Sequence, residues 1–212
     1  MLRNAEYIYN NIIIEDNINT TKKHCKKAQV GVDCTLAGVF RISEAGAIYR
    51  DKSKVSKYEQ IDKMSLKGDE SVIGWFLPKG TYMIMLNEGC QFGPNDTGYL
   101  VQRSSLNRSG CTVISSVWDP GYTSRDGDTV NQMSLRLNVD TDRGIFIEEN
   151  ARIAQLLVVS SEDTTSYSGQ FQGGSLTSRL DELQYNDSAC CEKSSDLAAR
   201  LQAKLEAIRG DL

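Results

Sequence analysis

The sequence predicts an all-β fold, a barrel or a jelly roll, and two observations support this prediction. The middle of the 212-residue chain contains many short runs rich in β-branched and aromatic residues, and turn signals separate them. Short strands at this spacing are typical of barrels and jelly rolls, whereas βαβ units place a helix between successive strands. The expected strands are residues 38–42, 81–86, 99–102, 111–117, 133–139, 144–147 and 153–159.

Proline and glycine mark the turns between these strands. The chain has 3 prolines and 17 glycines, and each proline lies in a turn signal, at residues 78–80, 93–96 and 119–121. A fourth signal, Asp-Gly-Asp, occupies residues 126–128. Proline presets the backbone of the first central turn residue and glycine tolerates a positive φ at the second, so the strands are expected to reverse at these positions.

The two ends of the chain differ from its β-rich middle. We expect a short helix followed by a strand within residues 5–18, and an added C-terminal helix over residues 194–209. The apolar residues of the latter recur at spacings of four, four and three, which is one helical face. They are Leu197, Leu201, Leu205 and Ile208. This face needs a partner, which is the subunit's own barrel, the same helix of other subunits or another protein.

We therefore expect two units, a β domain with a C-terminal arm over residues 1–182 and a linker with an amphipathic helix over 183–212.

Composition excludes several classes of protein. The net charge of −4 argues against a nucleic-acid-binding surface, although a few local cations are enough for a small anionic substrate. No apolar run approaches 18 residues, and the N-terminus does not read as a signal peptide, so no membrane contact is expected. Six cysteines without a C-x-x-C pair, beside the single histidine His24, predict reduced thiols and no protein-held metal. The expected location is the cytoplasm, a host's cytoplasm if the protein is viral.

Residues 101–110, Val-Gln-Arg-Ser-Ser-Leu-Asn-Arg-Ser-Gly, form the most informative segment. Arg103 and Arg108 flank the adjacent hydroxyls of Ser104 and Ser105. Hydroxyls donate to phosphate oxygens and guanidinium groups add charge-assisted contacts, so the segment suits an oxyanion. The alternative is that one of the serines simply caps a helix, and the two interpretations are compatible.

A second segment, Val-Trp-Asp-Pro-Gly-Tyr at 117–122, leaves Asp119 at a strand end beside Tyr122. A carboxylate there can orient a water as a base, and the tyrosine ring can stack under a sugar. Alternatively, Asp119 only hydrogen-bonds its own turn.

Two more segments complete the pattern. Gln155 interrupts the apolar strand 151–158, and its amide needs partners in the core backbone or in a ligand. Residues 167–175 are rich in glycine, which suits either a mobile arm that closes over a ligand or a flexible linker.

These four segments, in this order, resemble the dCTP deaminase and trimeric dUTPase family, and specifically its dCTP-deaminase-like branch. The resemblance covers roughly residues 5–180, and several motifs in the same order are far more specific than any one of them. Further similar segments lie at residues 29–36, 77–82 and 92–98.

The resemblance implies a distorted, dUTPase-like jelly roll that assembles as a homotrimer with active sites between subunits. It also implies Mg²⁺ that bridges the phosphates of a deoxynucleoside triphosphate. The phosphates would be held by Arg103, Ser104, Ser105 and Gln155. Asp119 would contact the sugar or orient the attacking water, and Asp33 would support the water network around the metal. The arm would contribute Gln170, Phe171 and Gln172.

Departures from the family's pattern bear on the reaction. Arg136 occupies the place of the glutamate that shuttles protons in the deaminases, and a guanidinium cannot act as that acid and base. The arm has Gln170-Phe171 where Lys-Tyr is usual. We therefore expect a dUTP diphosphatase that produces dUMP and pyrophosphate. The alternatives are dCTP deamination, alone or combined with dUTP cleavage, and a nucleotide-binding or structural trimer without catalysis.

Overall fold

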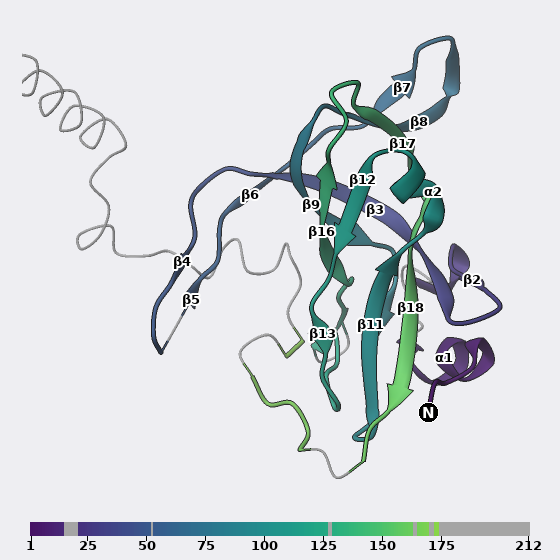
Figure 1. The fold of residues 1–212 in the computed structure, drawn as a ribbon, viewed down its shortest axis with the longest axis vertical. Coiled ribbons are helices and arrows are strands. Elements are labelled where there is room, and N and C mark those ends of the chain that lie inside the picture. The colour runs from purple at the N-terminus through teal and green to yellow at the C-terminus, as the bar shows by residue number, and fades with distance from the viewer. Residues whose placement is uncertain (15–20, 52, 127–128, 163–164, 170–171, 174–212) are drawn as a thin grey trace, which may run out of the picture. The chain divides into compact units, whose positions relative to one another are not determined.

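The computed structural model describes residues 1–14, 21–51, 53–126, 129–162, 165–169 and 172–173. Within these residues a curled sheet of nine antiparallel strands forms half a barrel, which confirms the predicted all-β, distorted jelly-roll fold (Figure 1). Its main path runs β12-β16-β9-β3-β18-β11-β13, while β2 and β6 pair with opposite ends of β3. The bounds are β2 (Lys26–Lys27), β3 (Val32–Ile42), β6 (Tyr58–Gln60), β9 (Gly80–Leu86), β11 (Asp96–Gln102), β12 (Cys111–Ile114), β13 (Val117–Trp118), β16 (Ser134–Val139) and β18 (Arg152–Ser160).

Smaller elements surround this sheet. Strands β17-β8-β7 form a separate sheet, and three two-stranded pairs are β1-β10, β4-β5 and β14-β15. Their bounds are β1 (Ile13–Ile14), β4 (Ala47–Ile48), β5 (Ser53–Lys54), β7 (Met64–Leu66), β8 (Asp69–Leu77), β10 (Gly89–Cys90), β14 (Arg125–Asp126), β15 (Thr129–Val130) and β17 (Ile145–Glu148). The helices are α1 (Ala5–Asn11), the single 3₁₀ turn η1 (Thr21–Lys23) and α2 (Ser104–Arg108). None of the helices in the described ranges is long and apolar enough to cross a membrane.

The N-terminal prediction of a helix followed by a strand is confirmed. Asn4 caps α1, because its side-chain oxygen accepts a hydrogen bond of 2.8 Å from the backbone N–H of Tyr7. Ile8 of this helix is fully buried against the sheet, and the chain continues into β1. The C-terminal helix and its linker lie outside the described residues. By internal contacts the chain divides into residues 1–180 and 181–212.

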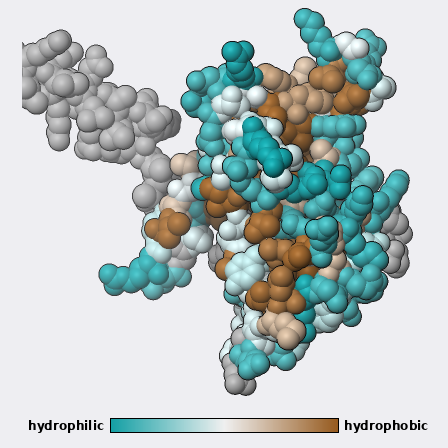
Figure 2. All heavy atoms as spheres, turned by 45° about the vertical axis from the view of Figure 1, so that its right-hand side comes forward, coloured by the Kyte–Doolittle hydropathy of each residue, from teal (hydrophilic) through white to brown (hydrophobic). Residues whose placement is uncertain are grey.

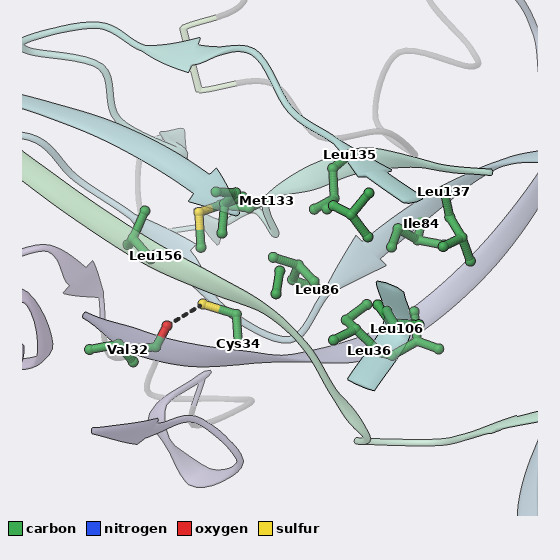
Figure 3. Packing of buried hydrophobic residues seen from close by; sticks show 14 of the residues in the cluster. Val32, Cys34, Leu36, Ile84, Leu86, Leu106, Met133, Leu135, Leu137 and Leu156 are labelled. Carbon is green, nitrogen blue, oxygen red and sulfur yellow. Dashed lines mark hydrogen bonds between the residues drawn. The ribbon is translucent and has the colours of Figure 1, made fainter. Parts of the chain in front are cut away.

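Alternating side chains of the main strands fill the interior of the half-barrel. Figure 3 shows Leu36, Ile84 and Leu137 from three neighbouring strands converging on one core. Each fully buried residue of this size contributes about 1.5–3 kcal/mol to folding before entropy costs. Cys34 lies among them and donates a weak hydrogen bond of 3.6 Å to the carbonyl of Val32. The described cysteines are free thiols, as expected.

One buried carboxyl group makes the stability of this core depend on pH. Glu88 is 0% exposed and accepts hydrogen bonds from the Thr35 backbone N–H at 2.9 Å and from the Thr35 hydroxyl at 2.8 Å. Burial raises the pKa of Glu88 from 4.5 to about 7. The folded state therefore holds a proton on Glu88 over a pH range in which the unfolded chain has released it.

Glu88→Gln should remove this pH dependence. A carboxyl whose folded pKa is raised favours folding below its unfolded pKa and loses that contribution as pH rises from 4.5 to about 7. The loss is roughly 3 kcal/mol at most. The glutamine does not titrate, so the melting temperature of Glu88→Gln should rise relative to the wild type between pH 5 and pH 8. Thermal melts across this range test the prediction, with Glu70→Gln on exposed β8 as the control. Parallel curves for the wild type and Glu88→Gln would contradict it.

Candidate active site

Two arginines and one aspartate form a cationic cradle at one end of β11. The carboxylate oxygen Oδ2 of Asp33 lies 3.3 Å from Nε of Arg103 and 3.2 Å from Nη1 of Arg152. Nη1 of Arg103 also donates to the backbone carbonyl of Arg152 at 3.3 Å. The Asp33 side chain is only 7% exposed, whereas those of Arg103 and Arg152 are 30% and 40% exposed. One buried carboxylate thus anchors two guanidinium groups that retain outward N–H donors for an oxyanion.

Gln155 lies beside this cradle. Its backbone pairs directly with Asp33 on one side and Val101 on the other, and the three side chains share the outer face of the sheet. The Gln155 amide donates to the backbone carbonyl of Val30 in the turn between β2 and β3. This partner is a backbone carbonyl in an exposed turn and not in the core, and a contact between Gln155 and a ligand stays a prediction.

The two serines begin helix α2, immediately after Arg103. The alternative that Ser104 or Ser105 caps this helix is wrong, because Arg103 occupies the N-cap position and makes no side-chain capping bond. Both serines sit inside the first turn and are exposed. Among the described residues their hydroxyls make no hydrogen bond, so they are available to a ligand. Arg108 is exposed in the last turn of the same helix.

Asp119 lies at the far end of β11, on a tight turn. The Tyr122 N–H donates to the Asp119 carbonyl at 3.0 Å, Pro120 is the first central residue, and Gly121 follows with φ of 76°. These are the features of a type II turn, which requires glycine at its second central position. The turn uses the backbone of Asp119. Its carboxylate is exposed and has no hydrogen bond within the described ranges, unlike the expected alternative of a self-capping turn.

Aromatic rings support this turn from inside. The Tyr122 ring lies 4.9 Å from that of Trp118 in an edge-on contact and 5.7 Å from that of Tyr167. Tyr122 is buried in the core cluster, and its stacking under a sugar stays a prediction. The indole N–H of Trp118 is buried without a hydrogen-bond partner in the described part of the chain.

Part of the glycine-rich arm lies on the Asp119 turn. The Gln172 amide donates to the Gly121 carbonyl at 3.0 Å, and the Gly173 N–H donates to the Thr123 carbonyl at 2.9 Å. A side chain at Gly121 would collide with Ser166, so glycine also permits this close approach. Gln170 and Phe171 lie outside the described residues.

Arg136, at the position of the expected deaminase glutamate, lies on β16. It pairs with Met83 and Ile114, and its side chain is exposed. No described carboxylate forms an ion pair with it. A guanidinium cannot act as a proton-transferring acid and base, and whether this position corresponds to the deaminase glutamate stays a prediction.

Arg152 is the cradle residue that sequence reasoning missed. In a regular strand Arg152 and Gln155 would point to opposite faces, because their spacing is odd. The register of β18 against β3 shifts between Arg152 and Ala154, and this bulge turns Arg152 onto the face of Asp33. The sequence signal that could have identified Arg152 is its position three residues before Gln155 in the same strand.

Fold and site together define a jelly-roll protein that clusters two arginines around one aspartate on its outer sheet face. The chain belongs to the dCTP deaminase-like family, whose model matches residues 4–161. The probable deoxyuridine 5′-triphosphate nucleotidohydrolase of Archaeoglobus fulgidus is 32% identical over 150 residues, which cover 70% of this chain and 81% of that protein. The protein of the same description from Aeropyrum pernix is 32% identical over 151 residues, covering 69% and 84%.

A solved structure shares the fold. The 2′-deoxycytidine 5′-triphosphate deaminase from Agrobacterium tumefaciens superposes with a TM-score of 0.52 and 14% identity. The match covers 77% of this chain and 49% of the deaminase chain, so this chain spans about half the length of that protein. At this identity the likeness concerns the fold alone.

Proposed function

We propose that the protein is a dUTP diphosphatase, which hydrolyses dUTP to dUMP and pyrophosphate. The observation that carries the proposal is the Arg103–Asp33–Arg152 cradle with the unbonded hydroxyls of Ser104 and Ser105 beside it. Its arrangement suits a polyphosphate, since guanidinium groups and hydroxyls donate to phosphate oxygens. The descriptions of the Archaeoglobus and Aeropyrum relatives support the same substrate.

The spacing along β11 supports an active site shared between subunits. Trp118 pairs with Gly98, so Asp119 lies near the level of Thr97, six residues from Arg103. At about 3.3 Å per residue this separates Asp119 from its own cradle by roughly 20 Å. A general base must lie within hydrogen-bond reach of the water that attacks the α-phosphorus. Asp119 and the cradle of the same chain are too far apart to act on one α-phosphorus. A neighbouring copy would supply the second group.

An apolar strip between the two groups supports the homotrimer. Tyr99 and Val117 are paired neighbours on β11 and β13, and Val101 lies on the same face two residues nearer to the cradle. Figure 2 shows apolar residues gathered in a band on one face of the molecule. The three side chains are between 38% and 50% exposed, which is typical of a face that another subunit covers. A copy packed there would lie next to the cradle.

Magnesium would be held by the substrate more than by the protein. The described residues contain no group of three or more His, Cys, Asp or Glu that could hold a metal ion. Mg²⁺ commonly binds substrate phosphates and retains several waters, which fits a site built from arginines and hydroxyls. When bound, the ion would neutralise phosphate charge.

The chemistry would then divide between the two groups. Asp119 from one subunit orients a water for in-line attack on the α-phosphorus, and accepts its proton. The bond from the α-phosphorus to the bridging oxygen breaks, and pyrophosphate leaves. Arg103 and Arg152 stabilise the charge that develops on the phosphate oxygens. Incubation of the purified protein with dUTP and Mg²⁺ tests the proposal, because equal amounts of dUMP and pyrophosphate should form. Binding of dUTP without product would point to a nucleotide-binding trimer instead.

The same protein should release no ammonia from dCTP. Deamination needs an acid–base group where the exposed guanidinium of Arg136 lies, and a guanidinium stays protonated at working pH. Chromatography of dCTP after prolonged incubation, together with an ammonia assay, checks this. Any dUTP or dUMP formed from dCTP would contradict it and would assign the base to another residue. Parallel incubation with dUTP shows that the preparation is active.

A further inference from the structure

The edge strand β2 carries two adjacent lysines that point to opposite faces of the sheet. Lys27 points toward helix α1, where its ammonium lies 2.7 Å from a Glu6 carboxylate oxygen and 5.3 Å from the centre of the Tyr9 ring. Lys26 pairs directly with Asp33 in the β2–β3 register. Since neighbouring residues in a strand alternate between faces, Lys26 lies on the face of the cradle.

Register extends this face across four strands. Lys26, Asp33, Gln155 and Val101 are successive partners on β2, β3, β18 and β11. Adjacent strands are about 4.8 Å apart, so the backbone of Lys26 lies roughly 5 Å from that of Asp33. One end of this row is the apolar strip, and the other end is Lys26 at the rim of the sheet.

No contact among the described residues accounts for a positive charge at Lys26. Its side chain is exposed, and within the described ranges no hydrogen bond, ion pair or ring contact involves its ammonium. By contrast, Lys27 pairs with Glu6, and Lys22 lies 5.1 Å from the centre of the Tyr9 ring. Of the two lysines of β2, the one that faces the cradle is therefore the one without a partner among the described residues.

Charge gives this lysine a role. The cradle of Arg103, Arg152 and Asp33 carries a formal charge of only +1, since the aspartate offsets one arginine. A nucleoside triphosphate carries several negative charges, and an ammonium offers three donors as a compact point charge. If a second subunit covers the apolar strip, its Asp119 approaches from the β11 side. The α-phosphorus then lies on that side and the pyrophosphate half lies toward β2.

We propose that Lys26 is a further substrate-binding residue, which contacts the β- and γ-phosphates of the nucleotide held in the cradle. This inference rests on the proposed function for the identity of the nucleotide. It does not rest on catalysis, because inorganic pyrophosphate alone is a probe of the same contact.

Lys26→Met and Lys27→Met form a matched pair for the test. Isothermal calorimetry of the full chain with inorganic pyrophosphate and Mg²⁺ should show roughly tenfold weaker binding for Lys26→Met, as expected for loss of one charge-assisted contact. Lys27→Met should bind like the wild type, and Lys26→Arg should retain most of the affinity. In steady-state assays the KM for dUTP should rise in Lys26→Met with a smaller change in kcat. Inhibition by dUMP, which lacks the pyrophosphate, should not change.

Two results would overturn the proposal. One is unchanged pyrophosphate affinity in Lys26→Met, and the other is an equal loss in Lys27→Met, which would indicate only a general charge effect. A wild-type protein that binds pyrophosphate but leaves dUTP intact would refute the diphosphatase and still allow the calorimetric test of Lys26.

Discussion

Asp119→Asn should lower the turnover of dUTP by roughly 10²-fold or more, the usual effect of removing a positioned general base. The substitution keeps the shape of the side chain and leaves the Asp119–Tyr122 turn intact, because that turn is closed by backbone atoms. KM, melting temperature and assembly mass should therefore change little. The matched control is Asp142→Asn, an exposed aspartate whose carboxylate pairs with Lys79 at 2.7 Å and not with a residue of the site. Near-normal turnover in Asp119→Asn would return Asp119 to the role of a turn residue.

Mixed assemblies test whether Asp119 acts across a subunit boundary. Asp119→Asn subunits and Arg103→Met subunits should each be almost inactive alone. If every site takes its base from one subunit and its cradle from another, random co-assembly restores both groups in about a quarter of the sites. Unfolding and refolding the two variants together, followed by a dUTP assay, measures the recovery. Absence of recovery in assemblies shown to be mixed would mean that both groups come from one chain.

Periodicity and turn chemistry predicted the β-sheet well, because both are local properties of the sequence. All seven expected strands overlap observed ones, and the proline of the 119–121 signal occupies the expected turn position. The expected run 111–117 is divided, since β12 pairs with β16 and β13 pairs with β11. The chain changes neighbours at Ser115-Ser116, and partner exchange leaves no mark on local periodicity. Strand β8 was missed because its first half is polar and exposed.

The site was predictable as a set of residues but not as a geometry. Arg103 and Asp119 could be singled out because two hydroxyls follow Arg103 directly and a Pro-Gly turn follows Asp119. The pairing of Asp33 with two arginines depends on the bulge in β18 and on a register across three strands. Such contacts join residues that are 70 positions apart for Arg103 and 119 for Arg152, and local patterns carry no information about them. Asp33, expected to support a metal-bound water network, contacts two guanidinium groups. Its role in that network stays a prediction.

Asp33→Asn should lower kcat/KM for dUTP by roughly 10²-fold, because small displacements of positioned groups have effects of this size. The Asp33 carboxylate is nearly buried, and a single oxygen holds both Arg103 and Arg152. An asparagine places a neutral oxygen there, which holds the two guanidinium groups much more weakly than a carboxylate does. They also repel one another more strongly once the negative charge is absent.

A double-mutant cycle separates positioning from direct catalysis. If Asp33 acts by holding Arg103, Asp33→Asn should have little further effect in the Arg103→Met background, where that group is already absent. The fold-loss of the double variant should then be much smaller than the product of the two single fold-losses. If Asp33 instead supports metal-bound water, the losses should multiply and the Mg²⁺ concentration for half-maximal activity should rise. The control is Asp96→Asn. Asp96 is an equally buried aspartate that accepts hydrogen bonds from Arg3 at 2.8 Å and Tyr7 at 2.7 Å near the opposite end of β11. Its loss should lower the melting temperature while the cradle keeps its geometry. A loss of pyrophosphate affinity confined to Asp33→Asn therefore identifies the anchoring of the two arginines as the cause.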